Sequence, residues 1–201
     1  MHFEFETDRF PVVMAKHFKD VTSKRAVRVI VIHSMEAPEK GETAENVARF
    51  FQNTERPASA HLCIDNNSIV QCVLDNDIAF AAPGANGDGI QLELAGFARQ
   101  SRAEWLDPYG VLLLENAANA AAQYCLKYDI PVKHLTDEEL KGGQKGIIGH
   151  VQASRVFKKS DHTDPGEGFP WDHFLDRVNH HRAERLKTAA TTRGGAEPLR
   201  V

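Results

Sequence analysis

The stretch RVIVIHS, residues 28–34, decides the fold of this chain. It is a continuous apolar run rich in β-branched side chains, which is the pattern of a strand buried on both faces of a sheet. Both faces of such a sheet are covered by other elements, usually helices. The single histidine of the run, His33, stands where the buried strand meets a loop.

Strand and helix patterns alternate along the rest of the chain. Residues 41–52 predict a helix with Thr43 as its N-cap, because apolar side chains recur there at helical spacing. Residues 59–73 predict two short strands joined by an Asp-Asn-Asn turn. The other predicted elements are a strand over 89–96, a long helix over 111–128, a short apolar strand or loop at 146–149 and a last helix that starts at Trp171.

This alternation predicts an α/β fold, a single domain with a central mixed β-sheet flanked by helices. With 201 residues, the chain can bury a core without disulfides or structural metals. We divide it into an N-terminal extension packed on the domain (1–26), the domain itself (27–186) and a tail (187–201). The tail has no core-forming pattern, so we predict that it is disordered.

Charge and composition exclude several classes of protein. A net charge of -4 and a pI of about 6.2 do not provide the basic patch of a nucleic-acid-binding protein. The first thirty residues contain no signal-peptide pattern, and no apolar run is long enough to insert into a membrane. The chain has an odd number of cysteines, and none of them is part of a CxxC motif: Cys63, Cys72 and Cys125. This pattern argues against a disulfide framework. We therefore expect synthesis in a reducing cytoplasm.

The predicted strand over 89–96 assigns its polar side chains to one face of the sheet. Successive side chains of a strand point to opposite faces. Ile90, Leu92 and Leu94 therefore share one face, and Gln91 and Glu93 share the other. Glu93 is predicted to point away from the more apolar face.

Two histidines and one aspartate are candidates for a zinc site. Catalytic zinc takes three protein ligands, usually histidine with a carboxylate or thiolate, and keeps a fourth position for water. None of the ten histidines forms an HExxH pair, so a site must combine distant segments. His33 at its strand end, His150 after the apolar run 146–149 and Asp164 in a Thr-Asp-Pro-Gly turn are the best placed. Each also fits a simpler role in packing, hydrogen bonding or turn formation, so spacing alone leaves the choice open.

Six motifs occur together in the order of a known family: RVIVIHS, ASAHLCID, SIVQCV, GIQLELAG, GHVQAS and HTDPGEGFPW. In this order, and roughly in its spacing, the chain resembles the zinc-dependent N-acetylmuramoyl-L-alanine amidases of the type 2 class. That group includes phage endolysins, the bacterial anhydromuropeptide-recycling amidase and the peptidoglycan recognition proteins. The resemblance covers about Val27 to Leu175, and it implies that residues 27–186 form an amidase catalytic domain with a Zn²⁺ cofactor.

The resemblance implies roles for five side chains. The family's zinc ligands fall on His33, His150 and Asp164, the last at a position where other members have cysteine. The family motif S-I-G-I-E-L aligns with GIQLEL and places the catalytic glutamate on Glu93, in agreement with the alternation of the strand. His162 stands where many members carry a lysine thought to steady the developing oxyanion.

Two further positions are candidates for the substrate groove. Relatives also carry histidine at the position of His61, which either lines the groove or is a buried hydrogen-bonding residue. The run AFAAPGAN, residues 79–86, stands where many relatives have Ala-Trp-His-Ala-Gly. Phe80 therefore occupies that part of the groove, and the peptide preference cannot be copied from those relatives.

The implied activity is zinc-dependent hydrolysis of the amide bond between N-acetylmuramic acid and L-alanine in peptidoglycan. Glu93 would be the general base and His162 the oxyanion donor. We expect an endolysin-type enzyme, made in the cytoplasm without a signal peptide, that acts on the wall once a partner permeabilises the membrane. Two alternatives stay open: a cytoplasmic recycling amidase that acts on soluble anhydromuropeptides, and a peptidoglycan-binding module without catalysis. Retention of Glu93 and Asp164 favours an enzyme. The oligomeric state leaves no signal in the sequence.

Overall fold

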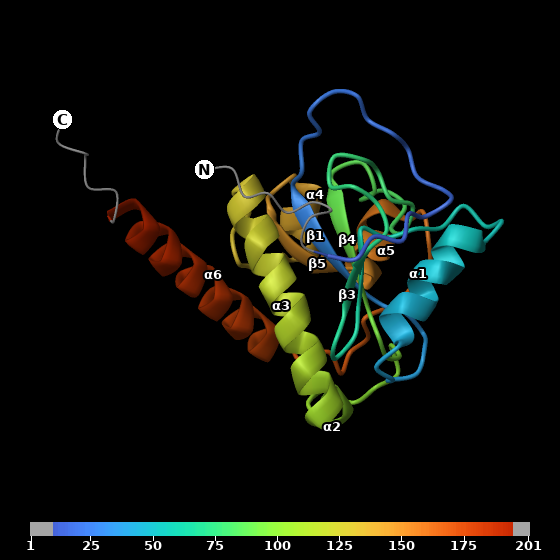
Figure 1. The fold of residues 1–201 in the computed structure, drawn as a ribbon. Helices are drawn as coiled ribbons and strands as arrows, with labels where there is room; N and C mark the ends of the chain where they lie inside the picture. Colours follow the sequence, from blue (N-terminus) through green and yellow to red (C-terminus); the bar gives the residue numbers. More distant parts are fainter. Residues whose placement is uncertain (1–9, 195–201) are drawn as a thin grey trace.

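Within residues 10–194, which the computed structural model describes, five strands form one mixed sheet in the order β3-β2-β4-β1-β5 (Figure 1). β3 is antiparallel to β2, whereas the other neighbouring strands are parallel. The strands are β1 Val29–Ser34, β2 Leu62–Ile64, β3 Ile69–Gln71, β4 Gly89–Leu94 and β5 Gly146–Gly149. The predicted single α/β domain with a mixed sheet is confirmed.

Helices cover both faces of the sheet in the described part of the chain (Figure 1). They are α1 Thr43–Asn53, α2 Arg102–Trp105, α3 Pro108–Tyr128, α4 Asp137–Lys141, α5 His150–Phe157 and α6 Trp171–Gly194. α3 and α6 pack together over one face, where the alanine stripe of α3 lies on Ile30 and Ile32. α1 and α5 lie on the opposite face, where α5 packs against Val31. Because both faces are covered, β1 is buried along its whole length, as its sequence predicts.

The pairing of β1 with β4 sets the geometry of the candidate site. The two strands are parallel, and His33 is the register partner of Glu93. Ile30, Ile32, Ile90 and Leu92 belong to the core under α3, so the odd-numbered side chains of both strands point to the other face. His33 and Glu93 therefore lie side by side at the carboxyl ends of adjacent parallel strands, where ligands bind in open α/β sheets.

Several predicted elements differ in detail from those in the structure. α1 begins at Thr43 as its first helical residue, with Glu42 in the N-cap position, and the Thr43 hydroxyl donates to Pro38 O at 2.7 Å instead of capping the helix. The long helix predicted from 111 begins earlier, at Pro108, where the Asp107 side chain accepts from Gly110 N at 2.7 Å.

α6 is longer than the sequence predicts. It continues through Gly194, so residues 187–194 are helical where we predicted disorder. A helix that is already nucleated extends at little further cost, and Lys187 pairs with Glu184 one turn back at 2.8 Å. Residues 195–201 of the predicted tail lie outside the described residues.

The segment before β1 packs against the sheet and its loops. Val13 N donates to Gln71 O, and Lys19 N donates to Ile78 O, both at 3.0 Å. The side chain of Arg25 is buried. Residues 1–9 are outside the described part, and the division into extension, domain and tail stays a prediction. No helix in the described residues combines the length and the apolar character needed to span a bilayer.

Candidate active site

A cavity of about 640 Å³ opens at the carboxyl ends of β1 and β4. Its lining includes His33, Glu93, His150, His162 and Asp164, which come from β1, β4, the start of α5 and the loop that follows α5. The structure thus brings together all five of the residues to which the family resemblance gives a role. Phe80 lines the same cavity.

Three of these side chains converge in an arrangement that could hold a metal ion, and we call them the ligand set. Nδ1 of His33 lies 3.1 Å from Asp164 Oδ2, and Nδ1 of His150 lies 3.2 Å from Asp164 Oδ1. One ligand atom from each residue lies within 4.8 Å of the others, and all three side chains are buried. Two imidazoles and a carboxylate are a donor set that suits catalytic Zn²⁺.

Strand pairing and one loop contact bring these ligands together. β5 runs parallel to β1 with Ile32 opposite Gly149, so His150, the first residue of α5, emerges beside His33. Asp164 reaches the same place because Val151 N donates to its main-chain oxygen at 2.9 Å. The loop after α5 is thereby tied to the first turn of that helix.

The buried amide of Gln91 orients His33. Nε2 of His33 lies 2.9 Å from Gln91 Oε1, and Gln91 Nε2 donates to Ala85 O at 3.1 Å. An amide oxygen only accepts, so Nε2 of His33 carries a hydrogen and Nδ1 faces the other two ligands. We assigned Gln91 no role from the sequence, although a polar residue in a buried strand is a visible signal.

Glu36 is a second residue that the sequence did not reveal. Its backbone adopts a left-handed conformation, with φ 51°, directly after β1. Its carboxylate accepts from Ser34 Oγ and from Ala98 N, both at 2.7 Å, and so ties the end of β1 to the loop after β4. Glu36 also lines the cavity, but nothing in the local sequence signals its conformation.

The electrostatics of the ligand set favour a cation. Burial alone would lower the pKa of His33, but the carboxylates of Glu93 and Asp164 outweigh it and raise the pKa to about 9. Burial opposes ionisation of Asp164, yet hydrogen bonds from His150 and His33 hold its pKa well below the usual range. For His150, burial lowers the pKa. Two carboxylates therefore stabilise positive charge at this point, as a divalent-cation site requires.

Glu93 stands next to the ligand set without belonging to it. Its Oε1 is 3.9 Å from His33 Nδ1, and its side chain is 14% exposed to the cavity. Burial raises the pKa of Glu93 to about 7, while the neighbouring His33 acts in the opposite direction. A carboxylate with a pKa near neutrality can both accept a proton and return it.

His162 lies at the rim of the cavity, with its side chain 59% exposed. Its ring stacks on that of His150 with centroids 4.2 Å apart, and its Nδ1 lies 3.3 Å from Asp164 Oδ1. The imidazole is thus held beside the ligand set while one side remains open to solvent.

His61 lies elsewhere. The side chain is fully buried just before β2, where Nδ1 accepts from Gln91 N at 3.0 Å. Its Nε2 lies 3.1 Å from Arg25 Nη2 and 3.2 Å from Asp77 O. Of the two roles left open for His61, this placement favours the buried hydrogen-bonding residue over the candidate groove position, because the ring is enclosed by hydrogen-bonding partners at the amino end of its strand.

The sequence profile of the Amidase_2 family, described as N-acetylmuramoyl-L-alanine amidase, matches residues 23–167. The chain belongs to this family. The resemblance seen in its motifs is thereby confirmed, and the chain is an amidase whose family acts on peptidoglycan. Among functionally curated proteins, no sequence matches this one significantly.

Solved structures of amidases share the Amidase_2 fold of this chain. The Staphylococcus aureus hydrolase AmiA superimposes with a TM-score of 0.65 at 16% identity, over 90% of this chain and 87% of AmiA. AmpD gives 0.59 at 16% identity, over 86% and 96% of the two chains. The endolysin LysCS of Clostridium intestinale gives 0.53 at 14% identity, over 87% and 97%. At these identities the likeness shows the fold alone.

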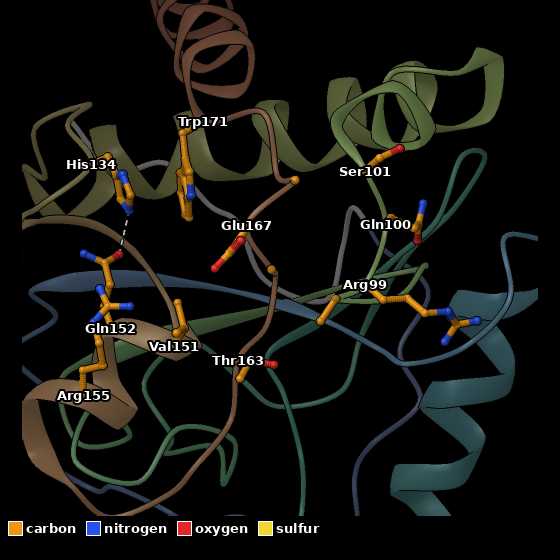
Figure 2. A pocket seen from close by; sticks show the side chains of 13 residues that line it. Arg99, Gln100, Ser101, His134, Val151, Gln152, Arg155, Thr163, Glu167 and Trp171 are labelled. Atoms are coloured by element: carbon orange, nitrogen blue, oxygen red, sulfur yellow. Dashed lines mark hydrogen bonds between the residues drawn. The ribbon is translucent and has the colours of Figure 1, made fainter.

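A second cavity borders the loop that carries Asp164, because Thr163, the neighbour of Asp164, is one of its lining residues (Figure 2). Its volume is about 830 Å³, and its walls come from the loop after β4, from His134, from α5 and from the segment that leads into α6. This cavity was not predicted, because its lining combines four stretches of sequence that are far apart.

Proposed function

We propose that this Amidase_2 enzyme is zinc-dependent and cleaves the amide bond between N-acetylmuramic acid and L-alanine, with His33, His150 and Asp164 holding the metal. The observation that carries the proposal is the convergence of these three ligand atoms beside Glu93 in one cavity. Bound Zn²⁺ supplies a water acidified to a pKa of about 7 and polarisation of the scissile carbonyl.

Glu93 is the general base in this proposal. It takes the proton from the attacking water and later passes it to the leaving amine of L-alanine. Its position one strand away from His33, in register, puts its carboxylate at the edge of the ligand set without occupying a ligand position. The pKa of about 7 that burial gives this carboxyl suits both transfers.

His162 donates a hydrogen bond to the carbonyl oxygen as negative charge develops on it. The support is its exposed ring at the rim, braced by stacking on His150 and by the contact with Asp164. A single donor of this kind is typically worth about 3 kcal/mol in the transition state. Phe80 contributes an apolar wall to the same cavity and contacts the substrate there.

The biological role that we propose is that of an endolysin-type lytic enzyme, which acts on the polymeric wall. The alternative is a recycling amidase that acts on soluble anhydromuropeptides. Both roles need the same chemical step, so they differ in the substrate that the enzyme prefers. Comparing initial rates on intact sacculi and on soluble anhydromuropeptides decides between them.

Mass spectrometry of digested peptidoglycan tests the activity directly. Purified sacculi are incubated with the zinc-loaded enzyme, with a chelated sample and with the Glu93→Ala variant. We expect stem peptides with a free L-alanine amino terminus only from the zinc-loaded wild type. Equal release from the chelated sample contradicts the zinc dependence, and intact peptidoglycan that binds the protein tightly contradicts catalysis.

A further inference from the structure

The second cavity is separate from the metal site but large enough for a ligand. Its volume of about 830 Å³ falls within the range of small-molecule pockets. Trp171, His134, Thr163 and Glu167 contribute to its walls (Figure 2). The three candidate zinc ligands are absent from the lining of this second cavity. The second cavity therefore does not take part in holding the metal.

A smaller hollow joins the two cavities along the surface. Glu36, His162 and Asp164 line both this hollow and the metal cavity. Ala98 and Thr163 line both this hollow and the second cavity. The three depressions therefore follow one another around the segment 162–164, and an extended ligand held at the metal site can continue into the second cavity.

A stacked pair of aromatic rings forms one wall of the second cavity. The rings of His134 and Trp171 are nearly parallel, 11° apart, with centroids at 3.8 Å. Phe169 meets Trp171 edge-on at 4.8 Å, and Gln152 Oε1 lies 2.6 Å from His134 Nε2, so both rings are held in place. Burial lowers the pKa of His134, which keeps the imidazole neutral near pH 7. The wall is a prearranged, uncharged aromatic platform.

The charges around this wall do not favour an anion. The Arg155 guanidinium is already bound by Asp137 through two contacts of 2.8 Å. Arg99 packs over the Phe97 ring at 4.0 Å, and its guanidinium points away from Trp171 (Figure 2). Glu167 is exposed beside the aromatic pair, and its carboxylate has no hydrogen-bond partner within the described chain.

A platform of this composition suits a saccharide ring. A pyranose presents a face of C–H groups that packs on the face of an aromatic ring, and its hydroxyl and acetamido groups donate hydrogen bonds. The Glu167 carboxylate is an acceptor for such donors and repels a phosphate or carboxylate ligand. The Thr163 hydroxyl is a further polar group in the lining.

We propose that the second cavity binds an N-acetylated hexosamine ring of the glycan strand, beyond the muramic acid whose amide is cut. Trp171 stacks on the ring, and Glu167 accepts hydrogen bonds from its polar groups. The inference rests on the proposed amidase function, because it assigns a neighbouring sugar of the same polymer. It implies that the enzyme holds glycan strands in preference to short muropeptides.

A binding experiment tests the assignment without any catalysis. The N-acetylglucosamine trimer is titrated into the metal-free chain of 201 residues while tryptophan fluorescence is recorded. The chain has two tryptophans, and Trp105 is fully buried, so a change reports on Trp171. We expect a saturable change, and we expect Glu167→Ala to weaken binding about tenfold, as loss of a hydrogen bond to a charged group does.

Glu138→Ala is the matched control, because Glu138 is an exposed glutamate on α4 that lines neither cavity. It should bind the trimer as the wild type does. Glu167 is exposed and its replacement leaves the core intact, whereas truncation of Trp171 would disturb the packing of Phe169. Trp171→Phe keeps an aromatic face but lacks the fluorescent reporter, so its affinity for the trimer is measured by isothermal titration calorimetry beside the wild type. We expect a reduced affinity while circular dichroism remains unchanged.

The outcomes separate this inference from the proposed function. If stem peptides are released from sacculi but the trimer gives no saturable signal, the sugar site is wrong and the amidase stands. Equal affinities for wild type and Glu167→Ala also overturn the sugar site. If the trimer binds as expected but no stem peptide is released, the cavity binds sugar and the proposed hydrolysis is wrong.

Discussion

His33 and His61 are two buried histidines that flank the same strand and have opposite electrostatic surroundings. Both contact Gln91 in β4: His33 meets its side-chain oxygen at 2.9 Å, and His61 Nδ1 accepts from its main-chain N–H at 3.0 Å. His33 lies at the carboxyl end of β1, whereas His61 directly precedes β2. Through Gln91, the candidate site around His33 is thus connected to the buried hydrogen bonds around His61.

The two rings are both buried, and their charged neighbours cause the difference between their pKa values. Burial lowers the pKa of His61 to about 3, with the Arg25 cation acting in the same direction. Burial also lowers the pKa of His33, but the carboxylates of Glu93 and Asp164 reverse the outcome and raise it to about 9. A buried histidine among carboxylates is suited to cations, and one beside a guanidinium is held neutral.

Replacing each histidine in turn is the strongest test of this contrast. We expect His33→Ala to lose stoichiometric Zn²⁺ and to reduce stem-peptide release to background, because one of three proposed ligands is removed. His61→Asn should keep one Zn²⁺ per chain. Metal analysis after dialysis measures both. A His33→Ala protein that retains a full equivalent of zinc contradicts the ligand assignment.

Replacing the proposed base separates proton transfer from metal binding. We expect Glu93→Ala and the isosteric Glu93→Gln to keep Zn²⁺ and to lose about 10²- to 10⁴-fold in kcat, because neither side chain accepts a proton. Steady-state release of stem peptides provides the rate. A near-normal rate in either variant would remove Glu93 from the mechanism.

Acid should destabilise the fold through His61. Its pKa is about 3 in the folded protein, against an ordinary value near 6.5 in the unfolded chain. Between these values the unfolded chain binds more protons, so stability falls as the pH is lowered from 6.5 toward 3. From this group alone we expect a loss of about 3 kcal/mol at pH 4.5.

Urea unfolding of metal-free wild type and His61→Asn at pH 6.5 and 4.5 measures this effect. Other groups change protonation over this interval in both proteins. The difference between the two proteins in how their free energy of unfolding depends on pH therefore isolates the contribution of His61. The variant should lose less stability than the wild type over this interval. Identical acid dependences would show that the ring is not held neutral in the fold.

The smallest expected effect concerns the residue that contacts both histidines. Gln91→Leu removes the acceptor that orients His33, and loss of such a partner typically weakens metal affinity about 10- to 100-fold. Competition with a chelator of known affinity measures it. Gln123→Leu, which replaces another buried glutamine on α3, is the control and should bind zinc normally. Equal affinities for the two variants would mean that Gln91 does not position His33.

The sequence predicts the candidate site at the carboxyl ends of β1 and β4 better than its surroundings. The β-branched run 28–34 places His33 at a strand end, and alternation in the next parallel strand turns Glu93 to the same face. The motif resemblance supplies the distant His150 and Asp164, which periodicity alone does not connect. These residues were predictable because strand geometry and family motifs point to the same positions.

The remaining features depend on contacts that no local pattern encodes. Alternation assigns a face to His61 but does not reveal that Arg25, from the segment before β1, fills the space beside it. The second cavity needs loops from four places to meet. The continuation of α6 to Gly194 depends on extension of an existing helix, whereas the composition of residues 187–194 taken alone indicates disorder.

The hydrogen-bonded ladder between β1 and β4 also bears on how such an enzyme can diverge. Main-chain pairing fixes His33 opposite Glu93, and a slip of one residue would turn one of them to the wrong face. The rims of both cavities come instead from loops such as 80–83 and 98–101, which tolerate replacement and insertion. Recognition of a new wall chemotype can therefore evolve by exchange of loops, while the chemical step is inherited unchanged.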